Sequence, residues 1–205
     1  MSLLHQARSI ASRVASSVYH DWGETFVRQG HLKKAIQSCT RAIELAPHRY
    51  DAYFNRGVAY LRQGDYDAAI ADFTTSLDLL PKQFKVFAHR GLAAYYKGDM
   101  AAAMSDYNMA IYYSSRESML YVYRGMVEHD EGRYEVALRD YDDAIRYNGR
   151  NAIAYRRRAE TQVKLGNVRQ AIRDYWTFLE VGMMTSQSTR AEIETIIGDL
   201  RQQLV

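Results

Sequence analysis

Cysteine and proline are almost missing from this chain. Among its 205 residues, Cys39 is the single cysteine and only two residues are proline. One cysteine excludes an intramolecular disulfide framework and a cysteine-rich zinc site. It also suits a reducing compartment, so we expect a cytoplasmic protein. The scarcity of proline, together with plentiful Ala, Leu, Arg and Glu, favours a chain that is helical throughout.

Strong charge of one sign and long apolar runs are missing as well. The formal net charge is +3, which is too small to indicate a polyanionic partner. No apolar run approaches the roughly 18 residues that a transmembrane helix needs, so we expect no membrane insertion. Apolar residues make up 47% of the chain and charged residues 25%. These values are typical of a folded domain and not of a disordered chain.

Motifs of catalytic chemistry are also absent. The sequence contains no phosphate loop, no HExxH pattern and no nucleophile elbow. No two of the six histidines have the spacing of metal ligands on a helix. Cys39 falls at a core position of the pattern described next, so we interpret it as a small packed hydrophobic residue. We therefore predict no enzymatic activity, no metal and no cofactor.

What the chain does contain is a repeat of 34 residues. Aligned on Gly57, five repeats follow one another without insertion, over residues 16–49, 50–83, 84–117, 118–151 and 152–185. Position 4 of every repeat is aromatic, position 15 is always glycine and position 20 is always alanine. The pattern predicts two short amphipathic helices separated by a glycine that ends the first. Such a short helix pair needs neighbours of the same shape to bury its apolar face.

This pattern resembles the tetratricopeptide repeat, which places aromatic, Gly, Tyr, Ala, Phe and Pro residues at fixed offsets over 34 residues. The resemblance covers residues 16–185 and implies an all-α protein, an α-solenoid of five tandem helix-turn-helix repeats. Two departures stand out. The family's proline survives only as Pro47 and Pro81, and its leucine at position 7 is replaced in four repeats by arginine: Arg56, Arg90, Arg124 and Arg158.

One helix is expected on each side of the repeats. In residues 186–205, Thr189 and Glu192 form a predicted capping box before an apolar face, which favours a C-terminal capping helix. Residues 1–15 place four apolar residues on one face, namely Leu3, Ala7, Ile10 and Val14. We favour an N-terminal cap packed on repeat one. The alternative is a mitochondrial targeting segment, because the stretch carries Ser and Arg and has no acidic residue before Asp21.

Every repeat with arginine at position 7 has aspartate at position 23. The four combinations are Arg56 with Asp72, Arg90 with Asp106, Arg124 with Asp140 and Arg158 with Asp174. Because the two positions lie on facing helices, we predict structural ion pairs, within a repeat or with its neighbour, and favour them over ligand-binding arginines. Repeat one lacks both residues and has Trp22 and Ser38 instead.

The resemblance implies a protein–protein interaction module, an adaptor or scaffold. In the family, the first helix of each repeat lines a concave groove. The residues at those positions are apolar and aromatic in the middle of the chain, which is typical of a binding surface. We predict that a peptide or partner helix binds there. The groove candidates are Phe54, Asn55, Val58, Lys85, His89, Leu92, Tyr95, Tyr96, Met119, Tyr123, Met126 and Arg157. For the apolar and aromatic ones, the alternative is packing between adjacent first helices.

Two other functions stay open. The chain could be a structural subunit or assembly factor of a larger complex that uses the superhelix edges or its N-terminal helix, which includes a homo-oligomer. RNA binding is prompted by the run of arginines at 156–158, but the small net charge disfavours a nucleic acid partner.

Chaperone-binding members of the family hold a C-terminal carboxylate with a set of cations and amides. Here Asn55 and Lys85 match that set, whereas Glu24 would repel a carboxylate. His20 and His89 replace permanent cations, which leaves only a weak, pH-dependent version of the clamp.

Overall fold

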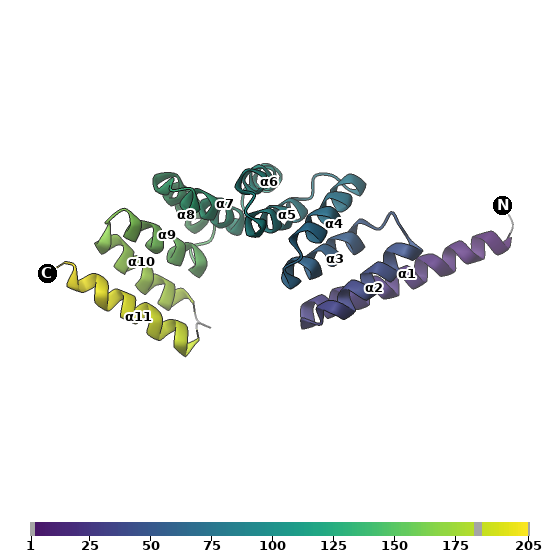
Figure 1. The fold of residues 1–205 in the computed structure, drawn as a ribbon, viewed down its shortest axis with the longest axis horizontal. Helices are drawn as coiled ribbons and strands as arrows, with labels where there is room; N and C mark the ends of the chain where they lie inside the picture. Colours follow the sequence, from purple (N-terminus) through teal and green to yellow (C-terminus); the bar gives the residue numbers. More distant parts are fainter. Residues whose placement is uncertain (1–2, 183–185, 205) are drawn as a thin grey trace. The chain divides into compact units, whose positions relative to one another are not determined.

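The computed structural model describes residues 3–182 and 186–204, and over these residues the chain forms eleven α-helices and no strand (Figure 1). The helices are α1 (Leu3–Gln29), α2 (Leu32–Leu45), α3 (Tyr50–Gln63), α4 (Tyr66–Leu79), α5 (Phe84–Lys97), α6 (Met100–Tyr113), α7 (Ser118–Asp130), α8 (Tyr134–Tyr147), α9 (Ala152–Lys164), α10 (Val168–Val181) and α11 (Gln187–Gln202). Each predicted repeat therefore contributes one pair, from α1 with α2 to α9 with α10.

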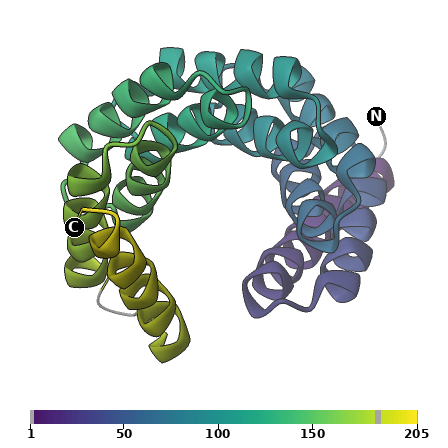
Figure 2. The same ribbon diagram turned by 60° about the vertical axis from the view of Figure 1, so that its left-hand side comes forward.

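The helices divide into two compact units, Met1–Tyr113 and Ser114–Val205, called here the N-terminal and C-terminal units. Within each unit, consecutive helices lie side by side (Figures 1 and 2). In the N-terminal unit, α2 packs on α3 and α4 packs on α5, so the second helix of one repeat covers the first helix of the next. In the C-terminal unit, α8 covers α9 in the same way, and α11 packs on α10.

A glycine in the left-handed conformation ends the first helix of the repeats, as the pattern predicts. Gly64 has φ of 86° and Gly98 has φ of 91°, values that residues with a side chain rarely adopt. The aspartate that follows begins the second helix. The Asp65 carboxylate accepts a hydrogen bond from the Ala68 amide, and the Asp99 carboxylate accepts one from the Ala102 amide. In these two repeats the turn is thus a helix stop followed directly by a helix cap. The equivalent residues of the other repeats, His31, Arg133 and Asn167, make no side-chain capping bond.

Helix pairs approach closely at position 8, where four repeats have glycine. A Cβ atom added to Gly57 would lie 2.8 Å from the Phe73 ring, and one added to Gly125 would lie 2.6 Å from the Tyr141 ring. In repeat one the same role falls to Gly23, whose added Cβ would lie 2.4 Å from the Cys39 sulfur. The side chain at position 24, which is large in these repeats except the first, therefore packs onto bare backbone and sets the spacing between the two helices of a pair.

The four Arg–Asp combinations are all in contact. Arg90 donates from Nε to Asp106 at 2.9 Å and from Nη2 at 2.8 Å, so the pair is bidentate. Its third donor, Nη1, reaches Thr74 on the second helix of the preceding repeat at 3.1 Å. The Arg90 guanidinium also lies over the Phe87 ring, at 5.6 Å from the ring centroid. One side chain thus joins α4, α5 and α6.

Arg124 makes the same two bonds to Asp140, and Arg56 and Arg158 repeat the full geometry of Arg90. Arg56 bonds Asp72 through two nitrogens and Thr40 of the preceding repeat through the third. Arg158 does the same with Asp174 and Asp142. The pairs therefore connect helices within a repeat and between neighbouring repeats.

Residues 3–15 are continuous with the first helix of repeat one and do not form a helix of their own. Helix α1 runs without interruption from Leu3 to Gln29, so it contains no break between residues 15 and 16. Ile10 and Val14 are exposed, and the side chains of Leu3 and Ala7 lie outside the described part of the structure. The reason is length: α1 has 27 residues, whereas the antiparallel α2 has 14 and ends at Leu45. The Leu45 carbonyl accepts a hydrogen bond from Ser12, and the part of α1 before Ser12 extends beyond α2.

The C-terminal helix begins earlier than predicted. The residue that caps α11 is Ser186, whose hydroxyl accepts a hydrogen bond from the Thr189 amide. Thr189 therefore lies inside the first turn and is not the cap itself. The apolar face behaves as expected, because Ile193, Ile197 and Leu200 are buried in a core shared with α9 and α10. Leu204, which follows the helix, is exposed.

A first prediction concerns the close approach at position 8. We expect Gly57→Ala to lower the free energy of unfolding by about 1–3 kcal/mol, because the new methyl group meets the buried Phe73 ring. Gly198→Ala is the matched control. It lies in α11, where an added Cβ meets nothing within 4 Å, so it should stabilise by about 0.5–1 kcal/mol through helix propensity. Urea unfolding of both variants checks the opposite signs, and two changes of the same sign would contradict this account.

A second prediction concerns the ion pairs. Arg90→Met or Asp106→Leu alone should destabilise on the order of 2–4 kcal/mol, because each leaves a poorly solvated charge without its partner. The double variant should lose less than either single variant, since both charges are then gone. Arg146→Met is a control at an exposed pair with Asp143, where the expected loss is below about 1 kcal/mol. Strictly additive losses in the double-mutant cycle would refute this interpretation.

Candidate protein-binding surface

The predicted groove residues of the N-terminal unit fall into a buried group and an exposed group. Asn55 and Val58 on α3 are buried. The Asn55 amide nitrogen lies 3.0 Å from Nε2 of His20 on α1 and donates to it, while His20 Nδ1 lies 3.1 Å from an Asp21 oxygen. Asn55 therefore connects α3 to α1. These two candidates support the stacking of first helices and present little surface to a ligand.

The His89 side chain also makes its contacts within the fold. Its Nδ1 donates a hydrogen bond to the Lys85 carbonyl at 2.7 Å. The ring packs against Phe54 with centroids 5.1 Å apart and against Phe73 with centroids 5.9 Å apart. Burial lowers the pKa of His89, and the charges of Arg62 and Lys85 lower it further. At neutral pH the imidazole is therefore uncharged, so it cannot replace a cation in a carboxylate clamp.

Exposed aromatic surface gathers instead at the C-terminal end of α5. Tyr96 keeps 53% of its surface exposed. Its ring stacks on Tyr66 with centroids 5.8 Å apart and meets Tyr95 edge-on at 5.4 Å. Leu92, one turn earlier on α5, is half-buried. Tyr96 is thus an exposed aromatic side chain supported by two other rings, and its supporting residues come from α4 and α5.

In the C-terminal unit, three candidates lie on α7. Met119, Tyr123 and Met126 are all half-buried. The Met119 sulfur lies 3.5 Å from the Asn151 amide nitrogen, which donates to it. Arg157 on α9 bonds Glu160 of its own helix at 3.0 Å. These side chains contribute a mixed apolar and charged surface to the first helices of this unit.

The arginine run at 156–158 is paired with carboxylates. Arg156 bonds Glu160 at 2.9 Å, Arg157 bonds the other oxygen of Glu160, and Arg158 is held by Asp174 and Asp142. Hydrogen bonding to Asp174 raises the pKa of Arg158, as expected for a stable ion pair. The run therefore lacks the unpaired cations that binding to phosphate requires.

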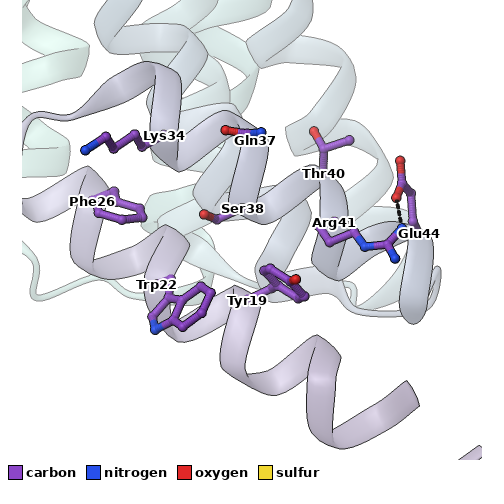
Figure 3. Close-up of a pocket in the computed structure, with 9 residues that line it drawn as sticks. All are labelled: Tyr19, Trp22, Phe26, Lys34, Gln37, Ser38, Thr40, Arg41 and Glu44. Carbon is purple, nitrogen blue, oxygen red and sulfur yellow. Dashed lines mark hydrogen bonds and ion pairs between the residues drawn. The ribbon is translucent and has the colours of Figure 1, made fainter. Parts of the chain in front are cut away.

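One surface was not among the sequence candidates. Tyr19, Trp22 and Phe26 follow one another along α1 and face α2 across a cleft of about 720 Å³ (Figure 3). The α2 side of the cleft is polar and is lined by Lys34, Gln37, Ser38, Thr40, Arg41 and Glu44. The sequence did hold a signal, because Trp22 stands at position 7, where the other repeats have arginine. The cleft can take apolar side chains along α1 and polar groups along α2.

The described residues show no feature of a reactive cysteine, a metal site or a membrane-spanning helix. Cys39 is buried, and burial raises the pKa of its thiol to about 12, so it stays protonated and unreactive at neutral pH. Across the described residues, no three His, Cys, Asp or Glu side chains gather in a way that could hold a metal ion. None of the described helices combines the length and apolar character that crossing a bilayer requires.

A third prediction follows from the half-buried imidazole of His89. Its pKa is lowered in the folded state, so below about pH 6.5, the ordinary histidine pKa, the unfolded chain takes up more protons than the folded chain does. This contribution to stability is present above that pH and is lost as the pH falls. We expect His89→Gln to flatten the decline in stability between neutral and mildly acidic pH, measured by urea unfolding. His48→Gln, at an exposed histidine, should leave the decline unchanged. Equal declines in wild type and His89→Gln would contradict the assignment.

The fold agrees with comparisons to known proteins. A sequence model of the family described as "Tetratricopeptide repeat" matches residues 20–84, 64–118 and 124–179. No curated protein matches the chain by sequence.

Solved structures of low sequence identity share the fold. The chain is 17% identical to TTC0263, a thermophilic TPR protein of Thermus thermophilus, with a TM-score of 0.72 over 92% of this chain and 100% of that one. It is 17% identical to PilF of Pseudomonas aeruginosa, with a TM-score of 0.76 over 95% and 92% of the two chains. It is 16% identical to YrrB, a TPR protein with an unusual peptide-binding site, with a TM-score of 0.65 over 86% and 90%. Since the family pattern spans most of the chain and its helix pairs have the corresponding geometry, the chain belongs to the tetratricopeptide-repeat family of protein-interaction modules.

Proposed function

We propose that the first-helix face of α3 and α5 binds a peptide or a partner helix, and that Tyr96 is its principal anchor. The proposal rests on one observation: Tyr96 is exposed although two neighbouring rings hold it in place. An aromatic side chain that is already ordered loses little conformational entropy on binding, which is the property of an interface hot spot. Phe54 and Leu92, both half-buried, would extend the apolar contact along the same face.

The charges near this face indicate which ligand fits. Lys85 is exposed at the start of α5, and Arg62 is exposed at the end of α3, where it donates to the Val27 carbonyl at 2.6 Å. A peptide with an apolar or aromatic residue for Tyr96 and a carboxylate for Lys85 would complement both. The carboxylate contact would lie near the surface and contribute about 1 kcal/mol or less. Apolar contacts would therefore determine most of the affinity.

This proposal is tested by selecting binders from a displayed library of short random peptides on the immobilised full chain. The selected peptides should carry apolar or aromatic residues, and Tyr96→Ala should weaken them at least about tenfold, the loss expected for an aromatic anchor. Tyr112→Ala is the matched control: Tyr112 is 79% exposed but lies on α6, a second helix. Titration calorimetry with one selected peptide measures both effects. Unchanged affinity for Tyr96→Ala, or an equal loss for Tyr112→Ala, would overturn the proposal.

A role in assembly is the second candidate, and a separate observation favours it. Apolar side chains are exposed along α1, outside the α3 and α5 face, at Ile10, Val14, Val18 and Trp22. An exposed apolar stripe of this kind marks a contact surface for another protein chain.

A further inference from the structure

Inside each unit, the second helix of one repeat covers the first helix of the next. Helix α2 covers α3, and α4 covers α5. At this contact, a position-7 arginine bonds the preceding second helix, as Arg56 bonds Thr40 and Arg90 bonds Thr74. Helix α1 has the equivalent face, but among the described residues it packs only on α2 and α3. The stacking rule of the fold therefore leaves one helix face without its usual neighbour.

That face has a different composition from the covered ones. Trp22 stands where the arginine would be, and Ser38 where its aspartate would be. Trp22 lines the cleft between α1 and α2 together with Tyr19 and Phe26 (Figure 3). The arginine and aspartate of the other repeats are thus replaced by a tryptophan and a serine, and an exposed tryptophan favours burial against another apolar surface.

The apolar surface continues along α1 beyond the repeat. Ile10, Val14, Val18 and Trp22 follow at intervals of four residues and are 55%, 60%, 41% and 52% exposed. Residues four apart share one side of a helix, so the four form a stripe about 18 Å long. Ser12 and Ser16 hydrogen-bond the carbonyls of Leu45 and Ala42 on α2, which places α2 on the side of α1 away from Ile10, Val14 and Val18. Trp22 lies at the edge of the stripe, beside the cleft between α1 and α2.

The charges beside the stripe change sign along the helix. Arg13 is exposed in the first half of α1, no acidic residue precedes Asp21, and Asp21 and Glu24 are exposed in the second half. A second α1 laid antiparallel across the stripe would bring the Arg13 of each copy near the Asp21 of the other. It would also place Ile10 against Trp22 and Val14 against Val18. This surface is therefore complementary to itself under a two-fold rotation, as an isologous interface requires.

We propose that two copies of this chain associate through α1, antiparallel and related by a two-fold axis near residue 16. The first half of each α1 then occupies, on the partner, the place that a preceding second helix takes at α3 and α5. Consecutive helices of the repeats are also antiparallel, so the contact continues the stacking mode of the fold. Four exposed apolar side chains per copy make a small interface, below about 1,200 Å² in total, which corresponds to a weak, concentration-dependent dimer.

Sedimentation equilibrium on the full chain tests the dimer. The apparent mass should rise from 23.7 kDa toward twice that value with increasing concentration, with dissociation in the micromolar range. Val14→Asp should weaken association at least tenfold, because it places a charge in the centre of the stripe. Val163→Asp, the same change at an exposed valine of α9, should leave association unchanged. Circular dichroism checks that both variants are folded.

A charge exchange tests the antiparallel register. Asp21→Arg and Arg13→Asp should each weaken self-association, because each brings like charges together across the two-fold axis. Mixing the two variants should restore association as a heterodimer, since both contacts then join opposite charges. A chain that stays monomeric at all concentrations would overturn the proposal. The stripe would then be a binding surface for a helix of another protein. Undiminished association of Val14→Asp, or failure of the mixed variants to pair, would overturn it as well.

Discussion

A pair of 14-residue helices has too little surface to bury its own apolar face, and this constraint determines the rest of the structure. Four of the pairs close around one contact, between the glycine backbone at position 8 and the side chain at position 24, as with Gly57 and Phe73. The opposite side of each pair must then be covered by the next. In such arrays stability is a sum of the pairs and of the interfaces between neighbours.

The arginines at position 7 give the interfaces between repeats their polar part. Each has two nitrogens on the aspartate of its own repeat, and in Arg56, Arg90 and Arg158 the third reaches the preceding second helix. A leucine at position 7 would contribute packing alone. The hydrogen bonds of the planar guanidinium also fix the direction and the distance of the contact between the helices. The same arginine lies over the aromatic residue of position 4, so one residue type satisfies three contacts. Repeat one departs from this arrangement, and its exposed face is the one for which a second copy is proposed.

The first and the last helix differ in how much of their apolar surface is covered. At the C-terminal end, α11 covers α10 and buries Ile193, Ile197 and Leu200 in a continuous core. At the N-terminal end, α1 extends past α2 and exposes an apolar stripe and an aromatic cleft. A peptide bound to α3 and α5 would leave that stripe free. Partner binding and self-association would therefore use different faces of the N-terminal unit and would not compete directly.

The periodic residues were sufficient to predict the helix pairs, the glycine turns, the Arg–Asp partners and the family, because backbone conformation and the nearest helix depend on local sequence. The binding candidates were harder to predict, because exposure depends on how far apart neighbouring first helices lie. Asn55 and Val58 were predicted to face a ligand but are buried between helices, whereas Tyr96 at an equivalent type of position is exposed. The sequence by itself determined the repeat and its contacts. Only the tertiary structure decided which apolar side chains stay exposed, because that depends on the length of α2 relative to α1 and on which helix faces have a neighbour.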